Sequence, residues 1–207
     1  MRTSRFSASL TSRTRAFRMQ ARAFCNLIAG HEHIPLRHFL HSAHQSLPAL
    51  YALGLQLPGI CPEHEASYTR VSVEEWRRLF RSLSTRLGDR VHYSGVFDAY
   101  DRRDGQALIG NLADDLADVH ADLENGLRCW RAGDHENAVW EWHFMLECHW
   151  GEHATDAIRA LYWLRRDVQY GPVPCLTSAS SGRTRASRPV LEERTVRAAR
   201  RAADAQR

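Results

Sequence analysis

The chain of 207 residues is long enough for one domain of ordinary size with additional tails, and its 43% apolar and 25% charged residues are typical of a globular protein. Its formal charge of +4 is unevenly distributed, because residues 1–22 carry +6, residues 183–207 carry +5 and residues 23–182 carry −7. An acidic body lacks the basic surface that follows nucleic-acid phosphates, so a nucleic-acid partner is not expected.

The two ends of the chain differ in composition from the part between them. The N-terminal end is rich in Arg and Ser and contains no acid, whereas the C-terminal end loses helical periodicity and gains Arg. We therefore expect residues 1–20 to be a disordered basic arm, residues 21–170 to form a helical domain, and residues 171–207 to be a linker and basic tail.

Cysteine usage and hydropathy bear on the location of the protein. The chain has 5 cysteines, an odd number, and none of them forms a C-x-x-C pair. Because disulfide frameworks use even counts in shorter secreted chains, a reducing cytoplasm is expected. No apolar run approaches the roughly 20 residues that a membrane-spanning helix needs, so no membrane partner is expected.

Five segments repeat apolar residues at intervals of three and four, which predicts amphipathic helices. The predicted helices cover residues 16–30, 36–57, 73–87, 106–131 and 134–167. Ser72 and Glu75 form a capping-box pair that begins the third helix, and residues 90–105 are expected to be an ordered loop. The expected fold class is all-α: a single-domain bundle of about five main helices, without a β-sheet of consequence and with disordered basic tails.

The fourth predicted helix carries an apolar seam and a polar row beside it. The seam consists of Ile109, Leu112, Leu116, Val119, Leu123, Leu127 and Trp130, and the row consists of Asn111, Asp115, Asp118 and Asp122. Aspartate is a poor residue for a helix interior, and like charges one turn apart repel. The acidic row therefore predicts a cationic group opposite it.

The fifth predicted helix holds four of the six Trp and four of the twelve His residues. Its apolar face consists of Val139, Trp140, Leu146, Trp150, Ala154, Ala157, Ile158, Leu161 and Leu164. His143 and Glu147 lie within this face, and His149, His153 and Asp156 follow its flank. Acid and imidazole groups on a core helix indicate a candidate site, because burying them without partners is costly.

The short turn at Gly133 predicts that these two helices are antiparallel neighbours, so that their polar rows could meet. Carboxylate oxygens and imidazole nitrogens are ligands of Zn, Mn and Fe, and a divalent metal is therefore a candidate cofactor. The candidate metal ligands are Asp118, Glu147, His149 and His153. Glu147 and His149 lie about 200° apart on an ideal helix. They could share one ion only if the helix is distorted at Gly151.

A structural network is an alternative interpretation of the same residues. His143 and Glu147 could form a buried, mutually hydrogen-bonded pair. The acidic row could pair with arginines, for which the candidates are Arg77, Arg78, Arg81, Arg128, Arg131 and Arg159. The sequence leaves both interpretations open.

Several short motifs are shared with a known family. They are Phe24-Cys25, Leu50-Tyr51 with Leu57-Pro58, Phe97-Asp98-Ala99-Tyr100, Leu112-Ala-Asp-Asp-Leu-Ala-Asp118 and His149-Trp-Gly-x-His153-Ala-x-Asp-Ala-x-Arg-Ala-Leu161. Through them, residues 21–166 resemble the bacterial helical family catalogued as domain of unknown function 5063. That family prefers Pro in place of Ala99 and Arg in place of His143. The resemblance implies an all-helical bacterial fold and no particular activity.

Two functions remain compatible with these residues. The first is a binding or accessory module with an acidic and histidine cluster between the last two helices, whose partner is a protein or a small molecule. The alternative is a metal-dependent, hydrolase-like enzyme acting on a small molecule, in which a carboxylate activates a metal-bound water. The candidate ligand-binding residues are Asp115, Asp118, Asp122, Glu147, His149, His153, Asp156 and Arg159.

Overall fold

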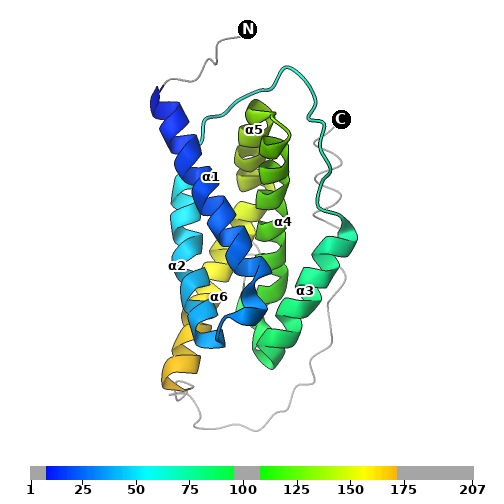
Figure 1. Ribbon diagram of the computed structural model, residues 1–207. Coiled ribbons are helices and arrows are strands. Elements are labelled where there is room, and N and C mark those ends of the chain that lie inside the picture. The colour runs from blue at the N-terminus through cyan, green and yellow to red at the C-terminus, as the bar shows by residue number, and fades with distance from the viewer. Residues whose placement is uncertain (1–7, 96–107, 172–207) are drawn as a thin grey trace.

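The computed structural model describes residues 8–95 and 108–171, and this part of the chain is a helical bundle (Figure 1). Its α-helices are α1 (Ala8–Ala29), α2 (Leu36–Gly54), α3 (Val73–Leu87), α4 (Leu112–Arg131), α5 (His135–Met145) and α6 (Gly151–Tyr170). A π-helical turn, Leu146–Trp150, joins α5 to α6. If α5, the turn and α6 are counted as one interrupted helix, the described residues contain five main helices, and the all-α prediction is confirmed.

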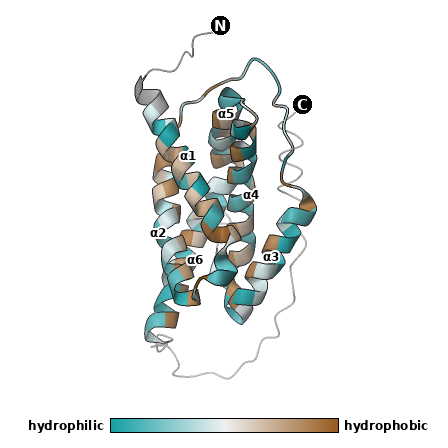
Figure 2. Ribbon diagram, in the orientation of Figure 1, coloured by the Kyte–Doolittle hydropathy of each residue, from teal (hydrophilic) through white to brown (hydrophobic). Residues whose placement is uncertain are grey.

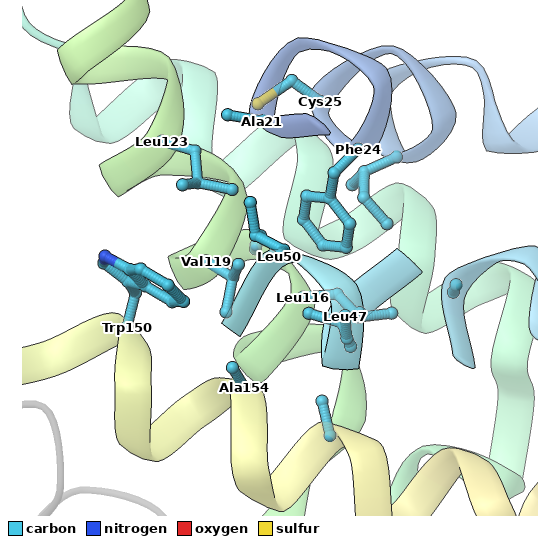
Figure 3. Packing of buried hydrophobic residues seen from close by; sticks show 14 of the residues in the cluster. Ala21, Phe24, Cys25, Leu47, Leu50, Leu116, Val119, Leu123, Trp150 and Ala154 are labelled. Atoms are coloured by element: carbon cyan, nitrogen blue, oxygen red, sulfur yellow. The ribbon is translucent and has the colours of Figure 1, made fainter. Parts of the chain in front are cut away.

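The central element of the bundle is α4, which packs against α1, α3, α5 and α6, while α2 packs against α1 and α6. Figure 2 shows hydrophobic and hydrophilic residues alternating along each helix, as in amphipathic helices. The close view in Figure 3 includes Phe24 of α1, Leu47 and Leu50 of α2, Leu116, Val119 and Leu123 of α4, and Trp150 of the π-helical turn. These side chains are all fully buried, so one apolar core holds the bundle together.

The first helix begins earlier than the sequence predicts. Helix α1 starts at Ala8, so residues 8–20, expected to be a disordered arm, are helical. Phe17 is fully buried and packs against Trp142 and Trp150, at ring-centroid distances of 5.2 and 6.2 Å. This aromatic burial extends the helix into the basic segment. Residues 1–7 and 172–207, which are also predicted to be disordered, lie outside the described residues.

The fourth helix begins later than predicted, at Leu112 instead of residue 106. Residues of the strands β1 (His92–Gly95) and β2 (Leu108–Asn111) pair as an antiparallel ribbon, with Tyr93 opposite Gly110. Ile109 therefore lies on a strand and is 61% exposed, so its assignment to the apolar seam is wrong. Asn111 ends the strand and caps α4, because its side chain accepts hydrogen bonds from the amides of Ala113 and Asp114.

The loop predicted at residues 90–105 is only partly described. Its start forms a 3₁₀ turn, Gly88–Val91, followed by strand β1, and residues 96–107 lie outside the described residues. The two-stranded ribbon is the only sheet among the described residues, so the expectation of no β-sheet of consequence is confirmed.

The connection between α2 and α3 arches over the end of the bundle that holds α5 (Figure 1). It is tied down by polar contacts, since Arg70 forms an ion pair with the buried Glu141 and the amide of Val71 donates to Asn125 at 2.7 Å. The capping box predicted for Ser72 and Glu75 is present at the start of α3. These contacts place α3 against the outer face of α4.

Trp142 is a core residue that the predicted apolar face does not include. In an uninterrupted α-helix, Trp142 and Trp150 would point about 80° apart. The π-helical turn adds a residue between them, and both are fully buried. Trp140 and Ile158, predicted on the face, are half-buried, whereas its other members are buried. None of the helices in the described ranges combines the length and apolar character needed to cross a bilayer.

Candidate metal centre

The acidic row of α4 faces two histidines of the interrupted helix. Asp122 Oδ2 lies 2.8 Å from His149 Nδ1, and Asp115 Oδ1 lies 2.8 Å from His153 Nδ1. The other ring nitrogen of His153, Nε2, lies 3.4 Å from Asp118 Oδ2. The predicted meeting of the two polar rows therefore occurs, and histidine is the cationic group opposite the aspartates.

The π-helical turn allows the interrupted helix to serve both the core and this cluster. Gly151 follows the turn, and a Cβ on it would lie only 2.2 Å from the carbonyl oxygen of Leu146. A side chain at this position would collide with backbone, so glycine is required for the close approach. The ligand spacing in the sequence requires a helix distortion at Gly151, and the structure has one directly before this residue, the π-helical turn Leu146–Trp150. His149 lies in the π-helical turn and His153 in the first turn of α6, and their ring centroids are 4.8 Å apart.

Three side chains offer a set of metal ligands. One ligand atom each from Asp118, His149 and His153 lies within 4.8 Å of the others, and these side chains are partly buried. Each histidine directs Nδ1 toward its own aspartate, which leaves Nε2 on the other side of the ring. In metal sites, such a carboxylate fixes the tautomer and the orientation of the histidine.

Two further hydrogen bonds hold the aspartates in place. The hydroxyl of Tyr93 donates to Asp115 Oδ2 at 2.5 Å, and the indole N–H of Trp76 donates to Asp118 Oδ1 at 2.6 Å. Oδ2 of Asp118 is therefore the oxygen that faces His153 Nε2. Gly110 allows the Tyr93 contact, because a Cβ there would lie 2.2 Å from the tyrosine ring.

The electrostatic environment favours a positive charge in the cluster. Burial lowers the pKa of His153, but the hydrogen bond that its imidazole donates to Asp115 and the charge of Asp118 outweigh burial and raise this pKa to about 9. Burial also lowers the pKa of His149, and its hydrogen bond and charge interaction with Asp122 reverse the direction, so the pKa is raised. The pKa of Asp118 is raised, chiefly by burial. Three aspartates surrounding two histidines can accommodate protons or a metal cation.

Glu147, His143 and Asp156 do not join the cluster. Glu147 is exposed on the π-helical turn, so the geometry separates it from the other three candidate metal ligands. His143 is half-buried, and no hydrogen bond joins it to Glu147 among the described residues. Asp156 is half-buried and lies 3.8 Å from Arg159, beyond His153 on α6.

The arginine alternative for the acidic row does not match the observed contacts. Arg128 binds Glu75 at 2.6 Å and Glu124 at 3.3 Å, and Arg131 also binds Glu124. Arg77 pairs with Glu74. The aspartates of the row instead contact histidine, tyrosine and tryptophan.

The chain belongs to the family described as "Domain of unknown function (DUF5063)", which matches residues 8–167. This range contains every residue of the cluster. The fold is also similar to the crystal structure of protein BF1032 from Bacteroides fragilis, with 22% sequence identity and a TM-score of 0.64 over 78% of this chain and 94% of that chain. At this identity the likeness shows a common fold alone. No curated protein matches the chain.

Proposed function

We propose that this protein is a divalent-metal-binding helical module in which Asp118, His149 and His153 are the metal ligands. The observation that carries the proposal is the direction of the two imidazoles. Each Nδ1 lies 2.8 Å from its own carboxylate, so both Nε2 atoms and Asp118 Oδ2 remain for one ion.

The charge balance supports a metal over a purely structural ion network. Asp115 and Asp122 each have a histidine partner at 2.8 Å, whereas Asp118 is a third, partly buried carboxylate that has only the more distant His153 Nε2, at 3.4 Å, and a raised pKa. A buried charge without full compensation costs stability. A divalent cation would supply the missing positive charge, and neutral histidines would then act as ligands through nitrogen.

The ligand types restrict the metal. Two imidazole nitrogens and one carboxylate oxygen suit Zn, Mn or Fe better than Ca or Mg, which prefer all-oxygen sites. Three protein ligands leave coordination positions for water or for a small molecule. The module would accordingly bind a partner through the metal, and a cytoplasmic location remains the expectation from the odd cysteine count.

The proposal is tested by titrating untagged, chelator-treated protein with Zn²⁺, Mn²⁺ and Fe²⁺ in a calorimeter, the iron under anaerobic conditions. We expect one ion per chain and at least a hundredfold weaker binding for the double variant His149→Gln/His153→Gln. Asp115→Asn should weaken binding by about 10–100-fold, as is usual for residues that orient a ligand. Glu147→Gln is the matched control, because this exposed carboxylate lies outside the cluster. The proposal fails if the wild type binds none of these ions or if the double variant binds them equally well.

A further inference from the structure

A cavity lies beside the cluster, between the β-ribbon and the last turns of α6. It has a volume of about 490 Å³, and its lining includes Arg90, Tyr93, Leu112, Arg159, Trp163 and Leu164. Tyr93 connects the two sites, because its ring lines the cavity while its hydroxyl binds Asp115. The cavity contains none of the three proposed metal ligands, so it is a separate binding region.

Two guanidinium groups of this cavity retain their hydrogen-bonding capacity. Arg90 lies 4.0 Å from Asp167, and Arg159 lies 3.8 Å from Asp156. These distances are too long for hydrogen bonds, and within residues 8–95 and 108–171 neither guanidinium has another ion pair. Each guanidinium offers five N–H donors in a planar arrangement that matches a carboxylate or a phosphate.

The backbone of β1 fixes the position of one of these arginines. A Cβ on Gly95 would lie 2.8 Å from Nη2 of Arg159, so the guanidinium lies directly against the strand. A larger residue at 95 would displace it. The absence of a side chain there lets the Arg159 side chain, which is 46% exposed, lie at the cavity wall.

Part of the remaining lining is apolar and lies next to the arginines, beside the polar residues His92, Ser94 and Asp167. Leu112 and Leu164 are buried, and Trp163 is 56% exposed, which is a large exposed area for an indole ring. An exposed tryptophan at a cavity offers a flat face on which a planar group can stack. The combination of two arginines with one indole therefore matches a ligand that is anionic at one end and planar at the other.

We propose that this cavity binds a small organic anion, with Arg90 and Arg159 receiving its carboxylate or phosphate group and Trp163 contacting its planar part. The inference goes beyond the proposed metal site and holds for the metal-free protein. A bound anion would contact Tyr93, whose hydroxyl binds Asp115, and Asp115 in turn orients His153.

The test uses the full chain in the presence of a chelator, with benzoate, phenyl phosphate and neutral benzamide as probes in a calorimetric titration. We expect benzoate or phenyl phosphate to bind at least tenfold more tightly than benzamide, and the tighter of the two identifies the anionic group. Arg159→Gln should weaken that binding at least tenfold. Arg81→Gln is the matched control, since Arg81 is an exposed arginine of α3 outside the cavity.

Trp163→Ala provides a second variant in case Arg159→Gln perturbs the fold, and it too should weaken binding of the anionic probe. The inference is overturned if both anions bind no better than benzamide, or if Arg159→Gln and Trp163→Ala both bind like Arg81→Gln. No metal is present in this titration, so neither result bears on the metal proposal, which is tested by the separate metal titration.

Discussion

At the scale of single residues, the three proposed metal ligands each contact a neighbouring side chain through one polar atom and have a second polar atom for a metal. Asp118 is the clearest example, because Trp76 donates to Oδ1 and Oδ2 faces His153. The same carboxylate is buried enough for its pKa to be raised. Its ionised form is therefore less favoured in the metal-free protein than in water, and it is the form that a metal requires.

Asp118→Asn separates these two effects. The amide keeps an oxygen for the Trp76 N–H but removes a buried negative charge that Asp122 repels. We expect the melting temperature of the metal-free protein to rise or stay unchanged at pH 7, while the increase on adding Zn²⁺ is lost. The exposed Asp89→Asn is the control for a general charge effect. A large drop in metal-free stability would mean that Asp118 is chiefly an ion-pair partner.

The histidines predict a pH dependence that metal should abolish. Their pKa values are raised on folding, to about 9 for His153, so the stabilisation from each histidine is complete below the unfolded pKa of about 6.5 and is lost as the pH rises through its folded pKa. The metal-free melting temperature should fall over this range. His31, His44 and His120 have lowered pKa values, and their contribution lies below pH 6.5.

The matching measurement compares melting temperatures from pH 6.5 to 9.5 for the metal-free wild type and the variant His149→Gln/His153→Gln. The decrease should be much smaller in the double variant and in the Zn²⁺-loaded wild type. Equal pH profiles for the wild type and the double variant would contradict the assignment of raised pKa values to this pair.

At the scale of elements, the interrupted helix combines core packing and ligand placement. The indole of Trp150 donates from Nε1 to the backbone carbonyl oxygen of Trp142, at 2.9 Å. Trp142 Nε1 in turn donates to the carbonyl oxygen of Leu123 at 3.0 Å. The π-helical turn is therefore held from the core side as well as by Gly151.

Gly151→Ala should disturb the turn and the cluster together. The added Cβ would lie 2.2 Å from the carbonyl oxygen of Leu146, so the backbone must move. We expect a loss of about 1–3 kcal/mol in unfolding free energy, typical of overpacking, and weaker Zn²⁺ binding. Gly59→Ala is the control, because a Cβ there has only an ordinary contact at 3.8 Å. If Gly151→Ala is destabilised but binds Zn²⁺ with unchanged affinity, the π-helical turn is not needed for metal binding.

Trp150→Ala tests the core face of the same element. The side chain is fully buried and its ring lies over Gly54, where a Cβ would be 2.9 Å away. Removing it should cost about 3–5 kcal/mol of unfolding free energy, measured by urea denaturation. Trp163→Ala removes an indole that is 56% exposed and should cost far less. Similar costs for the two variants would show that the core assignment is wrong.

At the scale of the whole molecule, local periodicity predicted the bundle well, because α4 and α6 have apolar faces that sequence spacing reveals. The same spacing placed Asp118, His149 and His153 on facing rows. It missed Tyr93 and Trp76, whose contacts join residues 22 and 42 positions apart and depend on strand pairing and on where α3 docks. It also missed the π-helical turn as the cause of Trp142 burial, since that register change depends on packing around Gly151.

We expect one ion to bind between α4 and the interrupted helix formed by α5, the π-helical turn and α6. The most direct measurement is a crystal structure of the Zn²⁺-loaded full chain with anomalous data at the zinc absorption edge. We expect one anomalous peak within about 2.0–2.2 Å of Nε2 of His149, Nε2 of His153 and Oδ2 of Asp118. A Zn²⁺-saturated crystal with no peak at this place, or with its peak ligated by Glu147 or His143 instead, would contradict the claim.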